Sequence, residues 1–382
     1  MVSMLRRLTS TFAGLLLPVT VSGEVIHEPL WVENLSPLAQ LVALPSQRSA
    51  DIKEGLSVSL HTDIATHFVS QASARERVFF DGETQKHSIA LRWGLSPQWE
   101  LSAHVSSIKH DGGFVDSYVN RWHDFFGMSD GGRSTMPEDQ IRFQFDGIEQ
   151  QSLLDRPVSG QSDSTLELSY VAERQQALQI AYAVGYKAST GSSERWLGSG
   201  ADDLYGVARF SGAHQGDLPL YWHGQFGVTR VGESALLGAQ QKDWLWFTGL
   251  SAEWLLDDRW SLIAQLDTHS ALVKSEVDAV GETAGMLSLG HGVNSVGSGH
   301  LMSVLPRILW SRARPILSFR HRFIFVPRLE KSPIFRTISS VISLARLSPA
   351  SQRPRPVLAQ CHQYDLALRQ TPRVSGRQRH RQ

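Results

Sequence analysis

The sequence has a single cysteine, Cys361, so the chain cannot form an intramolecular disulfide. This excludes a small secreted domain that is held together by disulfides. The sequence also lacks a run of about 18 apolar residues, which a membrane-spanning helix requires. A chain of 382 residues without either feature must gain its stability from a large sheet or from lipid, with its apolar residues spread over short segments.

Acidic residues are nearly absent from the end of the chain. Residues 301–382 contain 16 of the 37 lysines and arginines and eight of the 16 prolines, but only two acids, Glu330 and Asp365. Proline cannot donate to a sheet ladder, and the alternation is lost here apart from short stretches such as Ile316 to Phe325. We interpret residues 293–382 as an aberrant basic tail rich in proline and arginine, and our hypothesis is a frameshift. A genuine basic tail that binds phosphate groups is the alternative, and reading the gene in its other frames distinguishes the two.

The N-terminus has the features of a secretory signal peptide in the usual order. Arg6 and Arg7 precede an apolar stretch at residues 12–21, and small residues follow at the cleavage position. This predicts a signal peptide at residues 1–23 and therefore export, with a buried N-terminal helix as the alternative. Residues 24–54 are then expected to form a periplasmic N-terminal segment.

Residues 55–292 form the predicted main domain, in which the dominant hydrophobic period is two. About ten alternating runs follow one another, and several exceed the usual strand of ~5–6 residues. Their links alternate between short turns, such as 94–98, and longer polar segments, such as 69–86 and 106–165. This pattern predicts an all-β fold, an up-and-down antiparallel transmembrane β-barrel with short periplasmic turns and long external loops. About 12 strands are expected in an intact version.

Tryptophans flank the short links of this pattern. An indole has an apolar body and one N–H donor, so it settles at a membrane interface. A closed sheet in lipid also gives every backbone N–H and C=O an internal partner. A soluble β-sandwich, whose strands alternate as well, is the alternative. The barrel interpretation places five tryptophans in an aromatic girdle: Trp93, Trp99, Trp222, Trp254 and Trp260.

The segment 106–165 is too long for a plain connection. Aromatic residues within it recur at helical spacing and predict one amphipathic helix in this long loop. The favoured interpretation is that these aromatic residues pack within the loop. The alternatives are a helix that covers the barrel mouth or enters the lumen, and a helix that lies in the membrane interface. The aromatic residues concerned are Phe114, Tyr118, Trp122 and Phe125.

Several titratable residues lie on the polar faces of the runs. His61, Asp63, His67 and His104 would face the lumen. Histidines beside a carboxylate could bind a metal or act in acid–base catalysis, but polar lumen faces are ordinary in barrels. We therefore interpret these residues as solvating the lumen, and we predict no catalytic residue, no metal and no cofactor. The sequence Asp81-Gly82-Glu83 predicts a turn.

A set of short motifs runs through the first 292 residues. They are Asn34-Leu35-Ser36-Pro37, Asp81-Gly82-Glu83-Thr84, the segment Leu91–Leu101, Asp111-Gly112-Gly113-Phe114-Val115-Asp116-Ser117, Trp122-His123-Asp124-Phe125-Phe126-Gly127 and Gly131-Gly132-Arg133. In this combination the chain resembles an uncharacterised family of proteobacterial envelope proteins, domain of unknown function 3187, over roughly residues 25–292. The resemblance implies an outer-membrane β-barrel-like protein. It implies no activity, substrate or catalytic residue.

These observations together predict a structural or passive transport barrel of the cell outer membrane that is not an enzyme. One alternative is a barrel enzyme that acts on envelope lipids, such as an acyl hydrolase. A second alternative is a soluble periplasmic β-sandwich that binds a ligand. The expected partners are outer-membrane lipid, the barrel-assembly machinery and a small-molecule solute of unknown identity, and no nucleic acid is expected.

Overall fold

The structure is a computed structural model, and it describes residues 27–127, 132–175, 177–295, 299–304, 307–311, 314–318 and 328–329. The predicted signal peptide and most of the basic tail lie outside the described residues. Ten long strands dominate the described part. They are β1 (Gly55–Ala72), β2 (Arg77–Gly94), β3 (Trp99–Asp111), β7 (Ser164–Arg174), β8 (Gln179–Ala188), β9 (Asp203–Ala213), β10 (Leu220–Arg230), β11 (Trp244–Leu255), β12 (Trp260–His269) and β13 (Ala284–Ser295).

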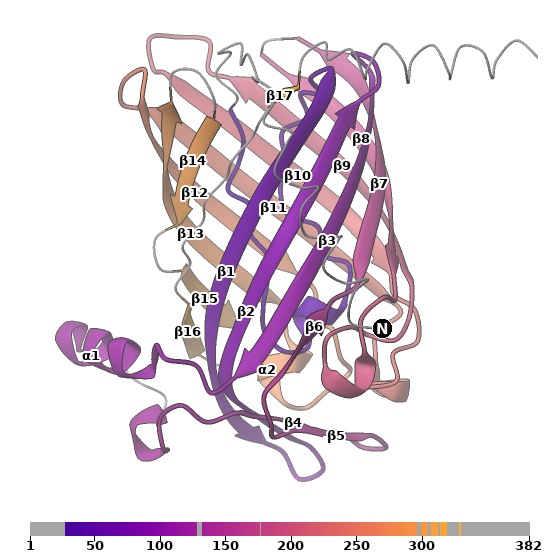
Figure 1. The fold of residues 1–382 in the computed structure, drawn as a ribbon, viewed down its shortest axis with the longest axis vertical. Coiled ribbons are helices and arrows are strands. Elements are labelled where there is room, and N and C mark those ends of the chain that lie inside the picture. Colours follow the sequence, from indigo (N-terminus) through magenta and orange to yellow (C-terminus); the bar gives the residue numbers. More distant parts are fainter. Residues whose placement is uncertain are drawn as a thin grey trace, which may run out of the picture. The chain divides into compact units, whose positions relative to one another are not determined.

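Each long strand pairs in antiparallel register with the next long strand along the chain, from β1 with β2 through to β12 with β13. The strands curve into a wall around an interior (Figure 1). Four short links, residues 95–98, 175–178, 214–219 and 256–259, mark what we call the short-link end of the wall. The opposite end is the long-link end. The predicted all-β, up-and-down antiparallel architecture is confirmed.

The described residues do not close this sheet. β13 continues into pairings with β14 (Gly299–Val304) and β15 (Arg307–Ser311), and β15 pairs with β16 (Arg314–Ser318). β1 pairs only with β2 and, over two residues, with β17 (Arg328–Leu329). Within the part of the chain that the structure describes, no ladder joins β13 or β16 to β1, so the barrel wall is open at this seam.

The predicted polar link at residues 69–86 is wrong. β1 and β2 stay paired as far as Ala72 and Arg77, so only residues 73–76 form the turn. Asp81 and Glu83 lie inside β2 and are buried, so the predicted Asp-Gly-Glu turn is wrong too. The character of the two faces changes here: the inward residues Val78 and Phe80 are apolar and join the core of the long-link end, while Asp81 and Glu83 lie on the other face of β2. A prediction that assumes outward-facing apolar residues therefore cannot recognise this part of β2 as a strand.

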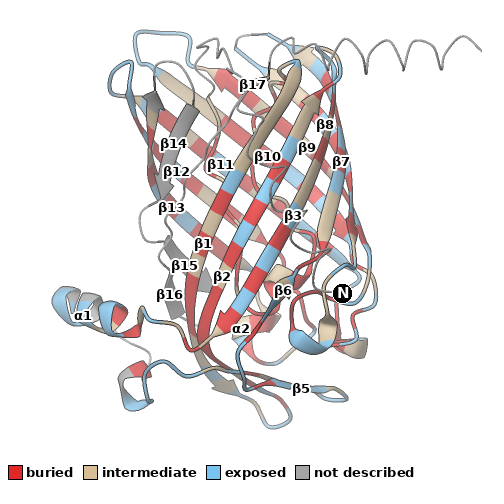
Figure 2. Ribbon diagram, in the orientation of Figure 1, coloured by how far each residue is buried: buried red, intermediate tan, exposed pale blue. Residues whose placement is uncertain are grey.

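Exposed and buried side chains alternate along the strands, so the outer and inner faces of the wall differ (Figure 2). Outward residues are large and apolar, for example Leu250 at 65% exposure and Val184 at 59%. Inward residues are buried and mostly polar, for example Ser251 and Gln265. Exposing a large apolar side chain to water costs about 1.5–3 kcal/mol, so a whole band of them indicates a lipid environment. No helix among the described residues has the length and apolar character to span a membrane.

Smaller elements gather at the long-link end. They are β4 (Arg142–Asp146), β5 (Gln151–Leu154), β6 (Val158–Gln161), α1 (Asp116–Phe126), α2 (Asp278–Gly281), and the 3-10 turns η2 (Ala39–Leu41), η3 (Arg133–Thr135), η4 (Ser193–Arg195) and η5 (Gly238–Gln240). Residues from several of them form the largest apolar core, which includes Phe143, Phe145, Trp196 and Leu237. This core lies at the long-link end of the interior, beyond the polar part of the wall.

Candidate functional site

The N-terminal segment, residues 27–54, runs inside the wall, and we call it the plug. It begins at the short-link end, where His27 stacks on Tyr221 at a ring distance of 3.4 Å. It then passes the wall residue Lys86, whose ammonium lies 2.8 Å from the Glu33 carboxylate. At the long-link end Leu38 and Leu41 pack into the apolar core. The segment that the sequence predicts to lie in the periplasm is thus, in its described part, in contact with the inner side of the wall.

The plug returns along a second path to the short-link end. The backbone N–H of Ala43 donates to Asp203 at 2.8 Å, and the N–H of Ala50 donates to Ser211 at 2.8 Å. Asp51 then lies 3.2 Å from Arg174, beside the short link that follows β7. The plug thus enters and leaves at the same end, and its tip fills the other end.

The tip of the plug folds for a local reason. The side chain of Asn34 accepts a hydrogen bond from the N–H of Ser36 at 3.0 Å, which starts a turn. The 3-10 turn η2 follows and directs Leu38 and Leu41 into the apolar core, where both are 1% exposed. The long-link core surrounds these leucines, so the tip is held by packing. The rest of the plug combines polar contacts with smaller apolar clusters, such as Leu30 and Val32 against Ile263.

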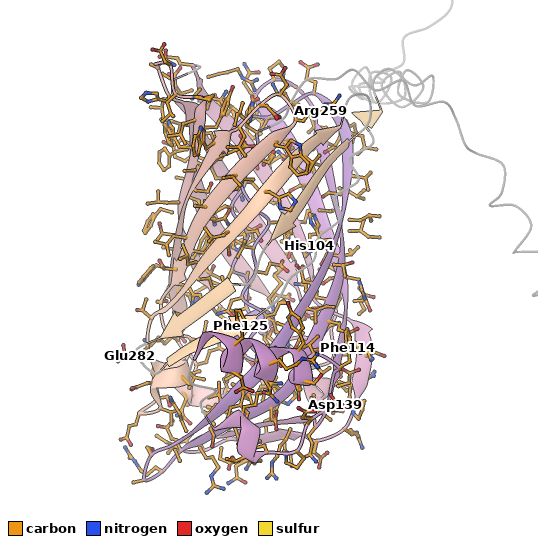
Figure 3. The ribbon with its side chains drawn as sticks, turned by 90° about the vertical axis from the view of Figure 1, so that its left-hand side faces the viewer. His104, Phe114, Phe125, Asp139, Arg259 and Glu282 are labelled. Carbon is orange, nitrogen blue, oxygen red and sulfur yellow. The ribbon has the colours of Figure 1, made fainter. Side chains whose placement is uncertain are left out.

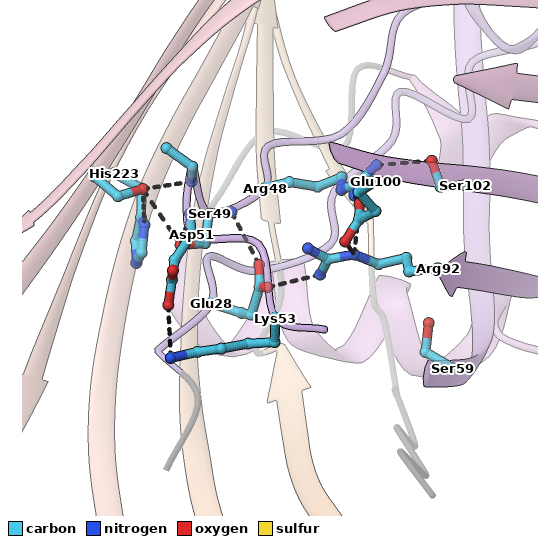
Figure 4. A network of polar contacts seen from close by, with 12 residues as sticks. Glu28, Arg48, Ser49, Asp51, Lys53, Ser59, Arg92, Glu100, Ser102 and His223 are labelled. Carbon is cyan, nitrogen blue, oxygen red and sulfur yellow. Dashed lines mark hydrogen bonds and ion pairs between the residues drawn. The ribbon is translucent and has the colours of Figure 1, made fainter. Parts of the chain in front are cut away.

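The strongest polar contacts form a cluster of three arginines and three glutamates, and Figure 4 shows four of them: Glu28, Arg48, Arg92 and Glu100. Arg48 of the plug donates to Glu167 of β7 at 2.7 Å and also pairs with Glu100 of β3. Glu28 of the plug accepts a hydrogen bond from Arg92 of β2 at 2.7 Å. The cluster therefore joins both paths of the plug to three wall strands. Its members are Glu28, Arg48, Arg92, Glu100, Glu167 and Arg209.

Equal numbers of opposite charges make this buried cluster tolerable. A buried charge costs several kcal/mol unless it is paired and hydrogen-bonded. Burial favours the neutral form of Glu28, but the Arg92 and Arg48 guanidiniums beside it hold its pKa at about 2. The Glu28 carboxylate also accepts a hydrogen bond from the N–H of Ser49 at 2.9 Å. Glu28 is therefore ionised at neutral pH and links the two paths of the plug.

A cavity of about 100 Å³ lies between the plug and β2, β3, β7 and β9. That volume accommodates a few water molecules. Its polar lining includes Arg48, Arg92, His104, Glu167 and Arg209.

The histidines and aspartate predicted to face the lumen point to the interior but do not form one site. His61 stacks on Trp31 of the plug at a ring distance of 4.4 Å, and His104 lies 5.2 Å from the same ring. His67 instead contacts Thr84 at 2.8 Å, and Asp63 is fully buried. Among the described residues, no group of three or more His, Cys, Asp or Glu side chains could hold a metal ion.

The sequence analysis missed the charged cluster and the plug. Arg92 and Glu100 occupy the polar positions of their runs, so each was visible as inward-facing. These two residues pair with each other, and Arg48, which joins them to the plug, lies in a segment with no regular period. The apolar residues Leu30, Val32 and Leu35, spaced closely before the first strand, were the available signal of a buried segment.

The predicted girdle tryptophans lie near the short-link end. Trp99, Trp254 and Trp260 are exposed on the outer face, while Trp93 and Trp222 are partly buried. Trp99 packs on Tyr170 of the neighbouring strand at a ring distance of 4.8 Å. An outward aromatic pair of this kind is what an interface band requires.

The predicted loop helix is present as α1, and the packing of its aromatic residues within the loop stays a prediction. Phe114, Tyr118 and Phe125 are 65%, 47% and 82% exposed, and Phe114 and Phe125 are labelled in Figure 3. The side chain of Trp122 lies outside the described residues. The faces of α1 that pack are those of Asp116 and Val119, which are buried.

Comparison with known proteins gives a family and several similar structures. A family model described as a protein of unknown function (DUF3187) matches residues 7–297. No curated protein sequence matches the chain. An outer membrane channel from Pseudomonas putida F1 is 12% identical with a TM-score of 0.46, over 72% of this chain and 96% of the channel.

Two further solved structures resemble the chain. The toluene transporter TbuX of Ralstonia pickettii is 9% identical with a TM-score of 0.36, over 73% of this chain and 90% of the transporter. A FadL homologue from Pseudomonas aeruginosa is 10% identical with a TM-score of 0.34, over 80% of this chain and 97% of the homologue.

Proposed function

The chain belongs to the DUF3187 family of proteins of unknown function, and for this member we propose a passive diffusion channel of the bacterial outer membrane that is closed by its own N-terminal plug. One observation carries the proposal: the strands are apolar on the outside and mostly polar on the inside, and residues 27–54 of the chain occupy the interior. A wall of this polarity supports a lipid exterior and an aqueous lumen.

The contacts of the plug favour a closed gate over a permanent core. Away from its tip, the plug makes many separate hydrogen bonds and ion pairs to wall side chains, such as Gln47 to Asp267 at 2.8 Å and Gln225 to the Pro45 carbonyl at 3.0 Å. Water can replace a neutral hydrogen bond such as that of Gln225 at a net cost of only about 0.5–1.5 kcal/mol. The apolar contacts of this part of the plug are few and small compared with the core around its tip.

The two alternatives do not fit this polarity. A soluble β-sandwich would bury its apolar faces between sheets, but here Leu250 and Leu262 lie exposed on the outer face. An enzyme that acts on envelope lipids would need its polar groups where lipid can reach them. In this wall the buried polar side chains face a lumen that the plug fills. We therefore propose transport and no enzymatic activity.

Insertion by the barrel-assembly machinery is part of the proposal. Open sheet edges do not occur in lipid, because their N–H and C=O groups would lack partners. A wall of this kind therefore needs a catalyst that protects its edges until it is in the membrane. Depleting that machinery is expected to leave the protein in the soluble periplasmic fraction.

Liposome swelling tests the proposed transport. The full chain and a variant that lacks residues 27–52 are reconstituted at equal density, and swelling is followed in small sugars of increasing mass. We expect slow swelling for the full chain and at least tenfold faster swelling for the variant, with a size cut-off. Each preparation is checked for heat-modifiable mobility on gels, which reports a folded barrel. A folded variant that is as impermeable as empty liposomes would refute the channel.

A further inference from the structure

Helix α1 carries an apolar surface outside the wall. Tyr118 and Phe125 are seven residues apart, so they lie within roughly 20° of each other around the helix. Phe114 lies two residues before the helix and is also exposed. Large apolar side chains that are exposed together on one side of an element are typical of a surface that binds a membrane or a partner.

The root of the loop is fixed to the outer face of β2. The N–H of Phe114 donates to the carboxylate of Glu83, which points outward from β2, at 3.4 Å. Gly113 has φ +82°, and a Cβ on it would come within 2.7 Å of the Glu83 side chain. The loop therefore lies directly against the outside of the wall, and only glycine allows this approach.

The helix is fixed at a second point on the same outer face. Arg133 of η3 pairs with Asp116 at the start of α1 and donates to Thr66 of β1 at 2.9 Å. Thr66 is 2% exposed although it points outward, because these groups cover it. Asp116 also accepts a hydrogen bond from the N–H of Asp139 at 3.0 Å. The contacts hold α1 outside the lumen, which argues against a helix that closes the barrel mouth.

The exposed side of α1 combines aromatic groups with one positive charge. Arg121 is exposed and lies roughly 40° from Phe125 and 60° from Tyr118 around the helix. Asp124 lies on another side, roughly 100° from Phe125. In Figure 1, α1 extends sideways from the wall, across the direction of the strands. A helix lying in a membrane interface has this orientation and this composition.

We propose that α1 is an interfacial helix that rests on the surrounding lipid layer, with its aromatic residues at the boundary between acyl chains and headgroups and Arg121 at lipid phosphates. Helix α1 is held against the outer face of β1 and β2, and further along these strands the same face exposes Leu60 and Ile89. The lipid proposed to contact α1 is therefore continuous with the lipid proposed to surround the wall. The inference rests on the membrane location in the proposed function but not on transport.

Labelling at single cysteines tests the contact with lipid. In a Cys361→Ser background, Phe125→Cys and Asp124→Cys are labelled with an environment-sensitive fluorophore and reconstituted in phosphatidylcholine vesicles with a quarter phosphatidylglycerol. Quenching is measured with doxyl groups on shallow lipid positions and with aqueous iodide. We expect the label at residue 125 to be quenched at least twofold more by lipid than the label at residue 124, and iodide to show the reverse.

The outcomes separate lipid from the other possible occupants. Equal quenching by iodide at both positions would mean that α1 stands in water and would overturn the proposal. Protection from both quenchers at residue 125 would mean that protein covers it, and this also overturns the proposal. Adding Arg121→Gln is expected to weaken the lipid quenching at residue 125, and to do so less in vesicles of phosphatidylcholine alone. Swelling assays on the same preparations report the channel independently.

Discussion

Arg48 of the plug donates to Glu167 of β7 at 2.7 Å, and the same carboxylate accepts two hydrogen bonds of 2.8 Å from Arg209 of β9. Glu100, the second partner of Arg48, is likewise bonded to Arg92 of the wall at 3.1 Å. Glu167 and Glu100 therefore each keep a partner in the wall when the plug leaves. This arrangement lets Arg48 be displaced without leaving either of these two acids buried and unpaired.

Replacing Arg48 by alanine is expected to loosen the plug and to leave the wall folded. The lost contacts belong to a buried pair, for which removal of one partner costs about 3–5 kcal/mol. The wall pairs just described should reduce that cost here. We expect liposome swelling several times faster than that of the unmodified chain, with unchanged heat-modifiable gel mobility.

Lys53→Ala is the matched control on the same plug. Lys53 pairs with Asp51 at 2.8 Å, but both side chains are partly exposed, so the pair is worth at most about 1 kcal/mol. Liposomes that contain the Lys53→Ala variant should swell at the same rate as liposomes that contain the unmodified chain. If Arg48→Ala stays closed while the variant without the plug swells, the charged cluster does not hold the gate.

A disulfide between the plug and the wall is expected to lock the channel. The Ser49 and Ser211 hydroxyl oxygens lie 3.4 Å apart and both residues are buried. Two sulfurs there need to approach to roughly 2.0 Å, which a small rotation of the side chains provides. Ser49→Cys with Ser211→Cys, combined with Arg48→Ala and Cys361→Ser, should be closed when oxidised and open after reduction with dithiothreitol.

Either cysteine alone is the control for this lock, since it should be open under both conditions. Disulfide formation is verified by a shift in gel mobility before swelling is measured. An oxidised, cross-linked protein that swells as fast as its reduced form would show that solutes bypass the plug.

The architecture could be predicted because the medium outside the wall sets it locally. Residues such as Leu250 and Ser251 alternate because one meets lipid and the other the lumen, and each position is decided by its own surroundings. The sequence analysis missed the extension of β1 and β2 because Glu83, a charged residue on the outer face, is covered by the start of the loop at Gly113. No pattern within β2 reveals what covers it.

The plug and the charged cluster could not be predicted for a different reason. Glu28 and Arg92 are 64 residues apart, and Arg48 and Glu167 are 119 apart. Such pairings depend on a chain path through the lumen that has no period of its own. Polar residues before a barrel look the same in the periplasm and in a lumen, because both offer water-like partners.

A charge on the outer face is expected to be costly only where it meets lipid. Leu250 lies near the middle of β11 and is 65% exposed, so Leu250→Arg should destabilise the barrel by about 2–4 kcal/mol in a bilayer. Leu256 is 52% exposed but lies in a short link, so Leu256→Arg should cost less than about 1 kcal/mol. Urea unfolding in vesicles measures both, and equal costs at the two sites would contradict a lipid-facing wall.

Acid is expected to release the plug through Glu28, which lies in the plug and not in a strand. Burial opposes its charge, but Arg92 and Arg48 hold its pKa at about 2, below the ordinary value of 4.5. A lowered carboxyl pKa stabilises the plugged state above pH 4.5, and this contribution fades as the pH falls toward 2. The full contribution is on the order of 3 kcal/mol. Channel conductance should therefore stay low from pH 7 to pH 4.5 and rise below that.

Glu28→Gln separates this carboxylate from the other titrating groups. The amide keeps the size of the side chain but cannot pair with Arg92 as an anion, so the variant should conduct more at pH 7 and respond less to acid. A conductance rise that is centred above pH 5 would point to the lumen histidines instead. Identical acid curves for the variant and the unmodified chain would remove Glu28 from the gate, because only the carboxylate distinguishes the two proteins.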